Sequence, residues 1–197
     1  MAKSTDLRTR RLLLTPFSER HLTEHYVAWL NDRELMKYSE QRHKHHTLAN
    51  CRSYWLSFEE TPHYFWAMEE IETGYRHIGN LSAYVDPHNR LADVSILIGD
   101  RGAHNKHYGL EALMAVFEYL FREVGLRKVT QGTMALNTPM LRLMRRLGMV
   151  PDGVRQRHYL CQEAEVDIVH MAMFRDQWDE IHQAGGNQPS GASGCIL

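Results

Sequence analysis

The stretch "IGDRGAHNKHYGLEALMAVFEYLF", residues 98–121, joins the end of a β-like run to a strongly periodic helix. Its apolar residues recur at the three- and four-residue spacing of one helical face, and Gly125 supplies a C-terminal stop. The polar loop before Gly109 has the layout of a phosphate cradle, because backbone N–H groups at a helix N-terminus attract anions. Such loops usually hold several glycines, and here His107 stands where a second glycine is typical.

The segments on either side predict an alternation of strands and helices. Downstream, strands are expected at 127–135, 154–161 and 165–173, with a helix at 138–147 that Gly148 ends. Upstream, the patterns predict a strand at 7–15, helical pieces after Ser18 and Asn31, a polar loop at 37–46, a helix after Thr47, and strands at 63–70, 76–86 and 92–99. The order β–α–α–β–β–β–α–β–α–β–β is an α/β (α+β) mixture with a mixed, mostly antiparallel sheet flanked by helices.

Length and composition indicate one globular domain. We expect the domain to cover residues 1–178, with the end of the last segment and a disordered Gly/Ser-rich tail in 179–197. A net charge of −1 argues against nucleic-acid binding, and no apolar run is long enough for a bilayer. There is no secretory signal pattern, and three scattered cysteines favour free thiols in a reducing cytoplasm.

Three segments resemble the GCN5-related N-acetyltransferase superfamily, and in particular its ribosomal-protein-alanine, spermidine and nucleotide-amino-sugar N-acetyltransferase branch. "ADVSILIGD" (92–100) matches the fourth strand of that family, and "HNKHYGLEA" (104–112) matches its coenzyme-A loop. "NTPMLRLMRRLGM" (137–149) matches the helix after the fifth strand. The resemblance covers roughly residues 7–174 and implies a single acyl-CoA N-acyltransferase domain.

The resemblance implies acetyl-CoA as cosubstrate. The pyrophosphate would be held mainly by backbone N–H groups and the helix dipole, which a loop with His107 in place of glycine also supplies if that position does not demand a positive φ. A backbone N–H around Leu97 to Gly99 would meet the oxyanion, and Asn137 would contact the pantetheine arm. The expected cofactor residues are Leu97, Ile98, Gly99, His104, Asn105, Lys106, His107, Tyr108, Gly109, Leu110 and Asn137.

The chemistry needs a neutral amine, so a proton acceptor is required. Asp93, at the start of the fourth family strand, matches a position where many relatives carry Glu and is our first choice, with Glu40 and Glu69 in reserve. In related enzymes a Tyr on the helix after Asn137 often protonates the leaving thiolate. Here Met144 occupies that position, so the proton donor is Tyr159, another group, or absent.

The acceptor is the least determined feature. The expected substrate residues are Tyr38, Glu40, Arg42 and Tyr84, and the basic loop at 37–46 favours a small anionic amine such as a nucleotide-linked amino sugar over a polyamine. A protein N-terminus is an alternative acceptor, and a non-catalytic acyl-CoA sensor is an alternative of another class. The histidines of the loop lack metal-ligand spacing, so no metal is expected, and a homodimer is left open.

Overall fold

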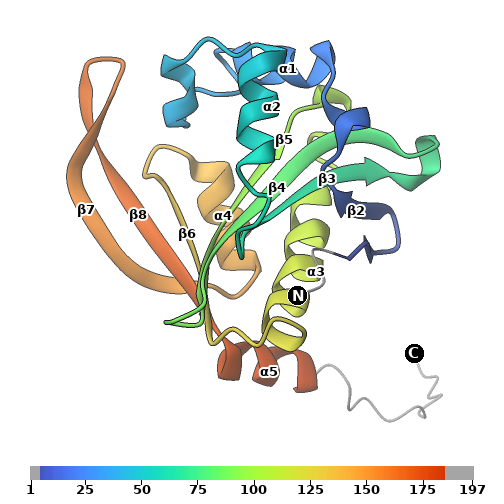
Figure 1. Ribbon diagram of the computed structural model, residues 1–197. Helices are drawn as coiled ribbons and strands as arrows, with labels where there is room; N and C mark the ends of the chain where they lie inside the picture. Colours follow the sequence, from blue (N-terminus) through green and yellow to red (C-terminus); the bar gives the residue numbers. More distant parts are fainter. Residues whose placement is uncertain (1–4, 185–197) are drawn as a thin grey trace, which may run out of the picture.

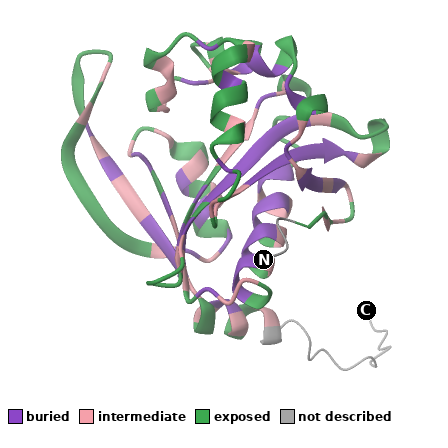
Figure 2. Ribbon diagram, in the orientation of Figure 1, coloured by how far each residue is buried: buried purple, intermediate pink, exposed green. Residues whose placement is uncertain are grey.

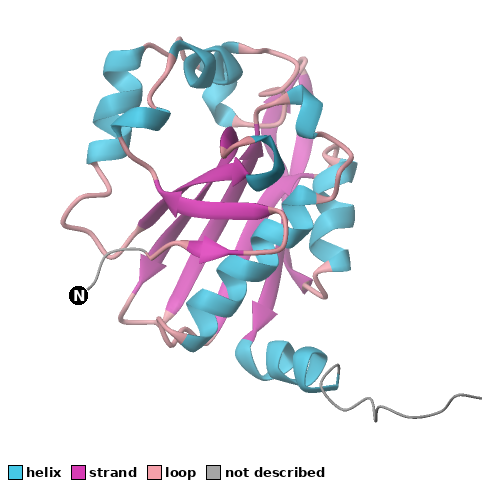
Figure 3. Cartoon of the chain, turned by 90° about the vertical axis from the view of Figure 1, so that its right-hand side faces the viewer, coloured by secondary structure: helices cyan, strands magenta, loops and turns pink. Residues whose placement is uncertain are grey.

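A computed structural model describes residues 5–184 of the chain as one eight-stranded sheet with helices on both sides (Figures 1 and 3). The strands lie in the order β1-β2-β3-β4-β5-β6-β8-β7, and every neighbouring pair is antiparallel except β5 and β6. The α+β class with a mixed, mostly antiparallel sheet is confirmed. No helix of the described part is long and apolar enough to cross a membrane.

The element bounds are as follows. The strands are β1 Leu7–Arg8, β2 Leu12–Pro16, β3 Tyr64–Glu70, β4 Arg76–Asp86, β5 Leu91–Ile98, β6 Lys128–Met134, β7 Val150–Cys161 and β8 Ala164–Phe174. The helices are α1 Glu24–Asn31, α2 Leu48–Leu56, α3 Tyr108–Arg122, α4 Thr138–Arg146 and α5 Arg175–Ala184. Short 3₁₀ turns cover Glu19–His21, Glu40–His43, Ile71–Thr73 and Arg101–Ala103.

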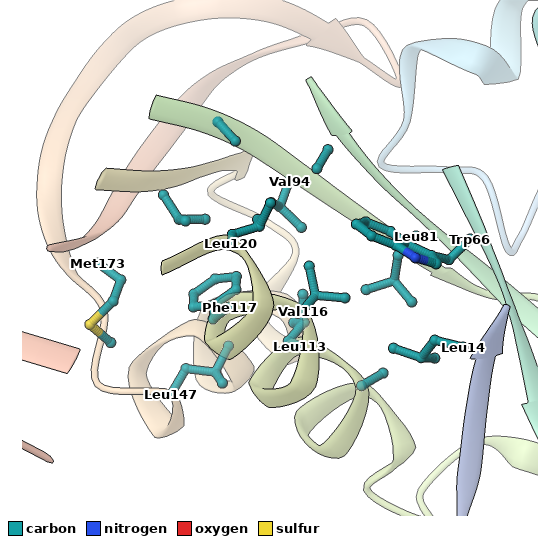
Figure 4. Close-up of a cluster of buried hydrophobic side chains, with 14 of the residues drawn as sticks. Leu14, Trp66, Leu81, Val94, Leu113, Val116, Phe117, Leu120, Leu147 and Met173 are labelled. Atoms are coloured by element: carbon teal, nitrogen blue, oxygen red, sulfur yellow. The ribbon is translucent and has the colours of Figure 1, made fainter. Parts of the chain in front are cut away.

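The main core lies between one face of the sheet and α3, as Figure 4 shows. Alternate residues of the central strands meet the apolar face of α3, the periodic helix predicted from the sequence. The labelled side chains from the strands are Leu14, Trp66, Leu81, Val94 and Met173, and those from the helix are Leu113, Val116, Phe117 and Leu120. A second apolar cluster packs α1 and α2 against the opposite face through Trp29, Cys51 and Phe65.

The sheet is split between β5 and β6. The two strands pair only where residues 91–93 lie beside residues 128–130, although β5 continues to Ile98 and β6 to Met134. Beyond Asp93 the strands therefore diverge and leave an open edge on each. This gap lies in the middle of the sheet, next to the N-terminal end of α3.

Several element predictions need correction. The strand predicted at 7–15 is two short strands, because Leu7 pairs with Leu14 across a turn in which Thr9 bonds to Leu12. The helix expected after Ser18 begins at Glu24 with Thr23 as its cap, since Ser18 caps only a 3₁₀ turn. The helical piece expected after Asn31 is a series of turns, and a 3₁₀ turn lies within the polar loop.

Helix α5 was not predicted and extends the folded unit beyond the expected boundary at residue 178. Trp178 is 1% exposed, packs on Phe117 and Phe121, and donates its indole N–H to Glu118 at 2.6 Å. The folded part therefore continues through α5. The remaining residues of the predicted tail, 185–197, lie outside the described residues, and so does Cys195; Cys51 and Cys161 are free thiols.

Candidate active site

A cavity of about 780 Å³ opens on the face of the sheet beneath α1, α2 and the segment 36–46. The strands supply its polar floor, because polar residues alternate along β4 and β5 on this face while apolar residues face α3. Ser82 on β4 and Ser95 on β5 lie opposite each other, with their hydroxyl oxygens 2.7 Å apart. We call this cavity the acceptor groove.

Asp93 lies in the floor of the groove at the point where β5 and β6 separate. Its carboxylate accepts a hydrogen bond from the Thr130 hydroxyl at 2.9 Å. The residue is exposed to the open groove, yet partial desolvation by the surrounding protein raises the pKa of its carboxyl. The Thr130 hydrogen bond and the nearby His170 imidazole oppose that shift. A carboxylate with a raised pKa is a better proton acceptor than an ordinary surface carboxylate.

The open edge of β5 carries backbone groups that face the gap. The Val94 carbonyl accepts from the Gln131 side chain at 3.2 Å, and the Ile98 carbonyl accepts from His104 at 2.9 Å, so even-numbered residues point toward β6. Odd-numbered Leu97 faces β4, and the Gly99 N–H donates to Ile78. Of the expected range Leu97 to Gly99, the N–H of Ile98 is thus the one that faces the gap.

The N-terminus of α3 lies at the end of this gap. The N–H groups of Tyr108, Gly109 and Leu110 have no partner within the helix, whereas Glu111 already bonds to the carbonyl of His107. These groups and the helix dipole suit a phosphate. The anion site therefore depends on backbone at these positions.

The side chains expected to contact the anion are largely used to hold the loop. His104 donates to the Ile98 carbonyl, Lys106 lies 3.3 Å from Glu70, and the Tyr108 hydroxyl donates to Glu70 at 2.5 Å. Asn105 and His107 both adopt left-handed backbone conformations, with φ of 60° and 62°. The sequence analysis expected histidine to be tolerated at position 107 if that position did not demand a positive φ. The φ of His107 is positive, so this condition is not met, and the loop accepts a residue other than glycine in this conformation.

Gly109 lies in a closely packed place, and its backbone angle is one that any residue adopts. It is buried in the first turn of α3, and a Cβ there would lie 3.2 Å from the Leu143 side chain and 3.5 Å from that of Ile98. Gly99 has the same role on the other face, where a Cβ would overlap the Trp29 ring at 2.0 Å. Both glycines let a helix approach the end of β5 closely.

Glu70 anchors the loop to the edge of the sheet. Its buried carboxylate accepts from Tyr108, Arg76, Thr73 and Lys106. The Tyr108 hydrogen bond, followed by that from Arg76, lowers the pKa of Glu70 to about 2. The ionised Glu70 carboxylate therefore binds Lys106 and Tyr108 and holds the loop before α3 in place.

The helix after β6 places Asn137 at its N-cap. The Asn137 side chain accepts from the N–H of Met140 at 3.3 Å and donates to the Thr133 hydroxyl at 3.0 Å, and it also lines the groove. Met144 is fully buried in the main core, so that position cannot present a donor to the groove. Tyr159 on β7 does line the groove.

The four expected substrate residues are not all in the groove. Tyr38 and Glu40 line it, whereas Arg42 does not. The Arg42 guanidinium bonds to Glu40 at 2.7 Å and to the Leu160 carbonyl at 2.8 Å, so it ties the segment 36–46 to the β7–β8 hairpin. The Tyr84 hydroxyl lies 2.6 Å from that of Tyr54, a groove residue on α2. Glu69, one of the two alternative proton acceptors, does not line the groove. It is buried, and its carboxylate is hydrogen-bonded to His21.

Several groove residues were missed from the sequence. They are Asn80, Ser82, Ser95, Gln131 and His170 on the central strands and Arg155 and His158 on β7, whereas Lys44 of the basic loop, which was expected to face the groove, does line it. The alternation of Asn80, Ser82 and Tyr84 between apolar residues could have indicated a polar sheet face. His170 had no such signal. In the described part of the chain, no group of three His, Cys, Asp or Glu side chains could hold a metal ion.

The arrangement fits an acetyl thioester of a phosphorylated carrier. The α3 N-terminus can hold phosphates, the β5 edge offers an N–H to a carbonyl oxygen, and the groove gives an amine access to the same gap from the other face. Each of these features depends on the separation of β5 from β6.

Comparisons with known proteins agree with this geometry. Residues 11–150 match the family model described as the acetyltransferase (GNAT) domain. The fold is similar to a GNAT-family acetyltransferase from Bacillus anthracis, with a TM-score of 0.74 and 19% identity over 87% of this chain and 99% of that one. It is also similar to spermidine N-acetyltransferase from Vibrio cholerae in complex with CoA and spermine, with a TM-score of 0.77, 16% identity, and coverage of 86% and 99%.

A third similar structure is the ribosomal-protein-S5-alanine acetyltransferase from Vibrio fischeri, with a TM-score of 0.76, 14% identity, and coverage of 89% and 99%. A search of curated protein sequences finds no match. The family model spans most of the chain, including β5, the loop and α3. The chain therefore belongs to the GNAT acetyltransferase family.

Proposed function

We propose that this enzyme, an acetyl-CoA-dependent N-acetyltransferase of the GNAT type, acetylates the primary amine of a small anionic molecule, with a nucleotide-linked amino sugar as the favoured acceptor. The observation that carries the proposal is the gap between β5 and β6, which joins the α3 N-terminus to a polar groove. Two substrates can reach the same backbone edge from opposite faces of the sheet. That arrangement supports direct transfer in a ternary complex.

Acetyl-CoA, when bound, supplies the acetyl thioester. The backbone N–H groups of Tyr108, Gly109 and Leu110 would hold its phosphates, and Asn137 would lie beside the pantetheine arm. The N–H of Ile98 would stabilise the negative charge that develops on the carbonyl oxygen. Asp93 would accept the proton that the amine must lose, with Thr130 holding its carboxylate.

Two cationic side chains favour an anionic acceptor. Lys44 and Arg155 line the groove, and neither forms a salt bridge within residues 5–184. Arg42, in contrast, already has a carboxylate partner in Glu40. Phosphate or carboxylate groups of an acceptor would satisfy the two free cations, and Arg155 could do so in a bidentate manner.

Two alternatives follow from other features. A protein N-terminus would also fit a groove that is open along one side, as the ribosomal-protein acetyltransferase with the same fold indicates. A non-catalytic acyl-CoA sensor is the alternative of another class, favoured by the histidine in the loop and by Met144 in the core. Amine-dependent release of the CoA thiol separates the enzyme from the sensor.

The first experiment is isothermal titration with acetyl-CoA, followed by a thiol-release assay with amino sugars, nucleotide-linked amino sugars, polyamines and N-terminal peptides. We expect micromolar binding and thiol release that requires an anionic amine. Asp93→Asn should lower kcat about 10²-fold at neutral pH with acetyl-CoA affinity unchanged, the loss typical of a general base. No binding at millimolar acetyl-CoA would exclude the whole proposal, and preference for polyamines or uncharged peptides would exclude the anionic acceptor.

A further inference from the structure

Strand β7 lines one side of the acceptor groove, and its pairing with β8 is irregular there. Arg155 pairs with Ile168, and Tyr159 pairs with Val166. Three residues of β7, 156–158, therefore lie opposite the single residue Asp167 of β8. Such an insertion in one strand of an antiparallel pair is a β-bulge, and we call residues 156–158 the β7 bulge.

The residues on either side of the β7 bulge both belong to the groove face. Ile168 and Val166 are two residues apart on β8 and point to the same face of the sheet, so their partners Arg155 and Tyr159 do too. Ile168, Arg155 and Tyr159 all line the groove. Bulges next to functional sites often redirect a side chain, which is the effect to look for here.

The redirected residue is His158. Neighbouring residues of a regular strand point to opposite faces, yet His158 and Tyr159 both line the groove. Their ring centroids are 4.7 Å apart. The β7 bulge therefore adds a further residue to this side of the groove, beside Arg155 and Tyr159.

The charges in and around the bulge have different partners. Arg157 does not line the groove, and its guanidinium pairs with Glu165 on β8 at 2.5 Å. Arg155 and His158 line the groove, are exposed, and form no salt bridge within residues 5–184. Both side chains are therefore free to donate hydrogen bonds to a phosphate or carboxylate that enters the groove.

Asp167 holds the bulge from outside the groove. It alternates with Val166 and Ile168 along β8, so it belongs to the other face, and it does not line the groove. Its carboxylate accepts the backbone N–H of Arg157 at 2.7 Å, and its carbonyl accepts the N–H of Ala135 at 2.9 Å. Arg157 has a φ of 51°, which is strained for a residue other than glycine, so this hydrogen bond supports an unfavourable backbone conformation.

We infer that the β7 bulge recognises the anionic group of the acceptor: Arg155 and His158 bind that group, and Asp167 is the positioning residue that holds the bulge. The inference rests on the proposed function and names the residues that select its acceptor. Lys44 lines the same groove from the segment 36–46, so an anion there would meet cations from two separate parts of the chain. Asp93 keeps its proposed role as the proton acceptor.

The experiment measures steady-state kinetics with acetyl-CoA and the fastest anionic acceptor of the amine panel. We expect Asp167→Ala to raise the acceptor KM about fivefold, with kcat and the affinity for acetyl-CoA unchanged, because the anion-binding side chains lose their position. Asp167→Asn should recover most of this loss, since an amide oxygen can still accept the Arg157 N–H. Asp152→Ala is the matched control: it removes the same charge from the hairpin, at a residue that pairs with Lys128 outside the groove, and should leave KM unchanged.

A second variant separates the shape of the bulge from its overall charge. Arg157→Gly keeps the backbone N–H, suits the positive φ, and removes a cation that does not line the groove. The acceptor KM of this variant should therefore equal that of wild type.

A third variant removes the bulge itself. Deletion of residues 156 and 157 would place His158 opposite Asp167 in a regular strand, where it would point away from the groove. We expect this variant to fold, because Arg155 and Tyr159 keep their partners on β8. Its acceptor KM should rise about as much as that of Asp167→Ala.

An Asp167→Ala enzyme with the wild-type KM for the acceptor would overturn the inference, and so would a wild-type KM in the deletion variant. Equal changes in Asp167→Ala and Asp167→Asn would also overturn it, because the lost charge and not the position of the bulge would then be responsible. Circular dichroism and acetyl-CoA affinity show whether each variant is folded, and the deletion variant decides the question if Asp167→Ala is not. Wild-type enzyme that releases no thiol with any amine, or that prefers polyamines or uncharged peptides, would instead refute the proposed function.

Discussion

His107 adopts a left-handed backbone conformation at the N-cap of α3, with φ of 62° and ψ of 18°. Its side chain makes no capping hydrogen bond, and its Nδ1 lies 3.3 Å from the Arg146 guanidinium. A residue with a Cβ is strained in this region, whereas glycine is not. The loop therefore carries local strain next to the N–H groups that would bind phosphate.

Replacing His107 with glycine should relieve this strain. We expect His107→Gly to raise the free energy of unfolding by about 1 kcal/mol, because the lost strain exceeds the added chain entropy. Chemical denaturation measures the change. His107→Ala is the matched control and should not stabilise, since it removes the imidazole but keeps the Cβ. Equal effects of both variants would show that the imidazole, and not the backbone angle, is responsible.

At the scale of single residues, the sequence predicts backbone roles better than side-chain roles. The place of Gly109 in the first turn of α3 follows from a motif that is continuous in sequence, and the phosphate-binding role of the N–H groups around it stays a prediction. His104 and Lys106 were expected at the anion but bond to the protein itself, which only the folded loop reveals. The place of His170 in the groove depends on its register with Gly132, 38 residues earlier, and no local pattern encodes that pairing.

Glu70 joins three elements at one carboxylate. It ends β3, pairs with Arg76 at the start of β4, and accepts from Tyr108 in the first turn of α3. Arg11 adds a second tie between the β2 side and α3 through Glu111 at 2.7 Å. The position of the helix N-terminus relative to the β5 edge thus depends on charges at the sheet edge.

Neutralising Glu70 should test this connection. Its lowered pKa, about 2 against 4.5, means that ionised Glu70 stabilises the fold above pH 4.5 and that this stability is lost as pH falls toward 2. We expect Glu70→Gln to cost about 2 kcal/mol at pH 7, after allowance for the half-exposed Arg76 and Lys106, and to remove this part of the acid dependence. Denaturation at pH 7 and pH 3 measures both effects, with exposed Glu72→Gln as control. Parallel pH curves for wild type and Glu70→Gln would contradict the prediction.

Periodic elements could be predicted from the sequence, and short or tertiary ones could not. Helix α3, the central strands and the β7–β8 hairpin follow from apolar spacing over many residues. The break between β1 and β2 arises from a turn at Thr9 that no glycine or proline marks. Helix α5 is a polar segment whose burial comes chiefly from Trp178 against α3, so its stability depends on contacts distant in sequence.

On the scale of the whole molecule, the split sheet creates a passage with different chemistry at its two ends. The α3 side offers helix N–H groups, and the groove side offers hydroxyls, carboxylates and imidazoles beneath a cationic rim. In Figure 2 the central strands are mostly buried, whereas β7 is exposed along most of its length. With a net charge of −1 for the full chain, long-range attraction of an anion is weak, so recognition of an anionic acceptor must depend on local cations.

Charge variants at the rim should therefore separate local recognition from structural support. Lys44→Ala and Arg155→Ala should each raise the acceptor KM several-fold and flatten its dependence on salt, because each removes an unpaired cation that a phosphate would meet.

Arg42→Ala should also raise the acceptor KM, because it releases the segment 36–46 from Leu160. It should keep the salt dependence of KM, since the Arg42 guanidinium already pairs with Glu40. Lys37→Ala is the control, because Lys37 pairs with Glu34 and does not line the groove. Steady-state kinetics at low and physiological ionic strength measure each effect. If KM for the preferred acceptor is independent of salt in wild type, the acceptor is not recognised by its charge, and a peptide N-terminus becomes the better candidate.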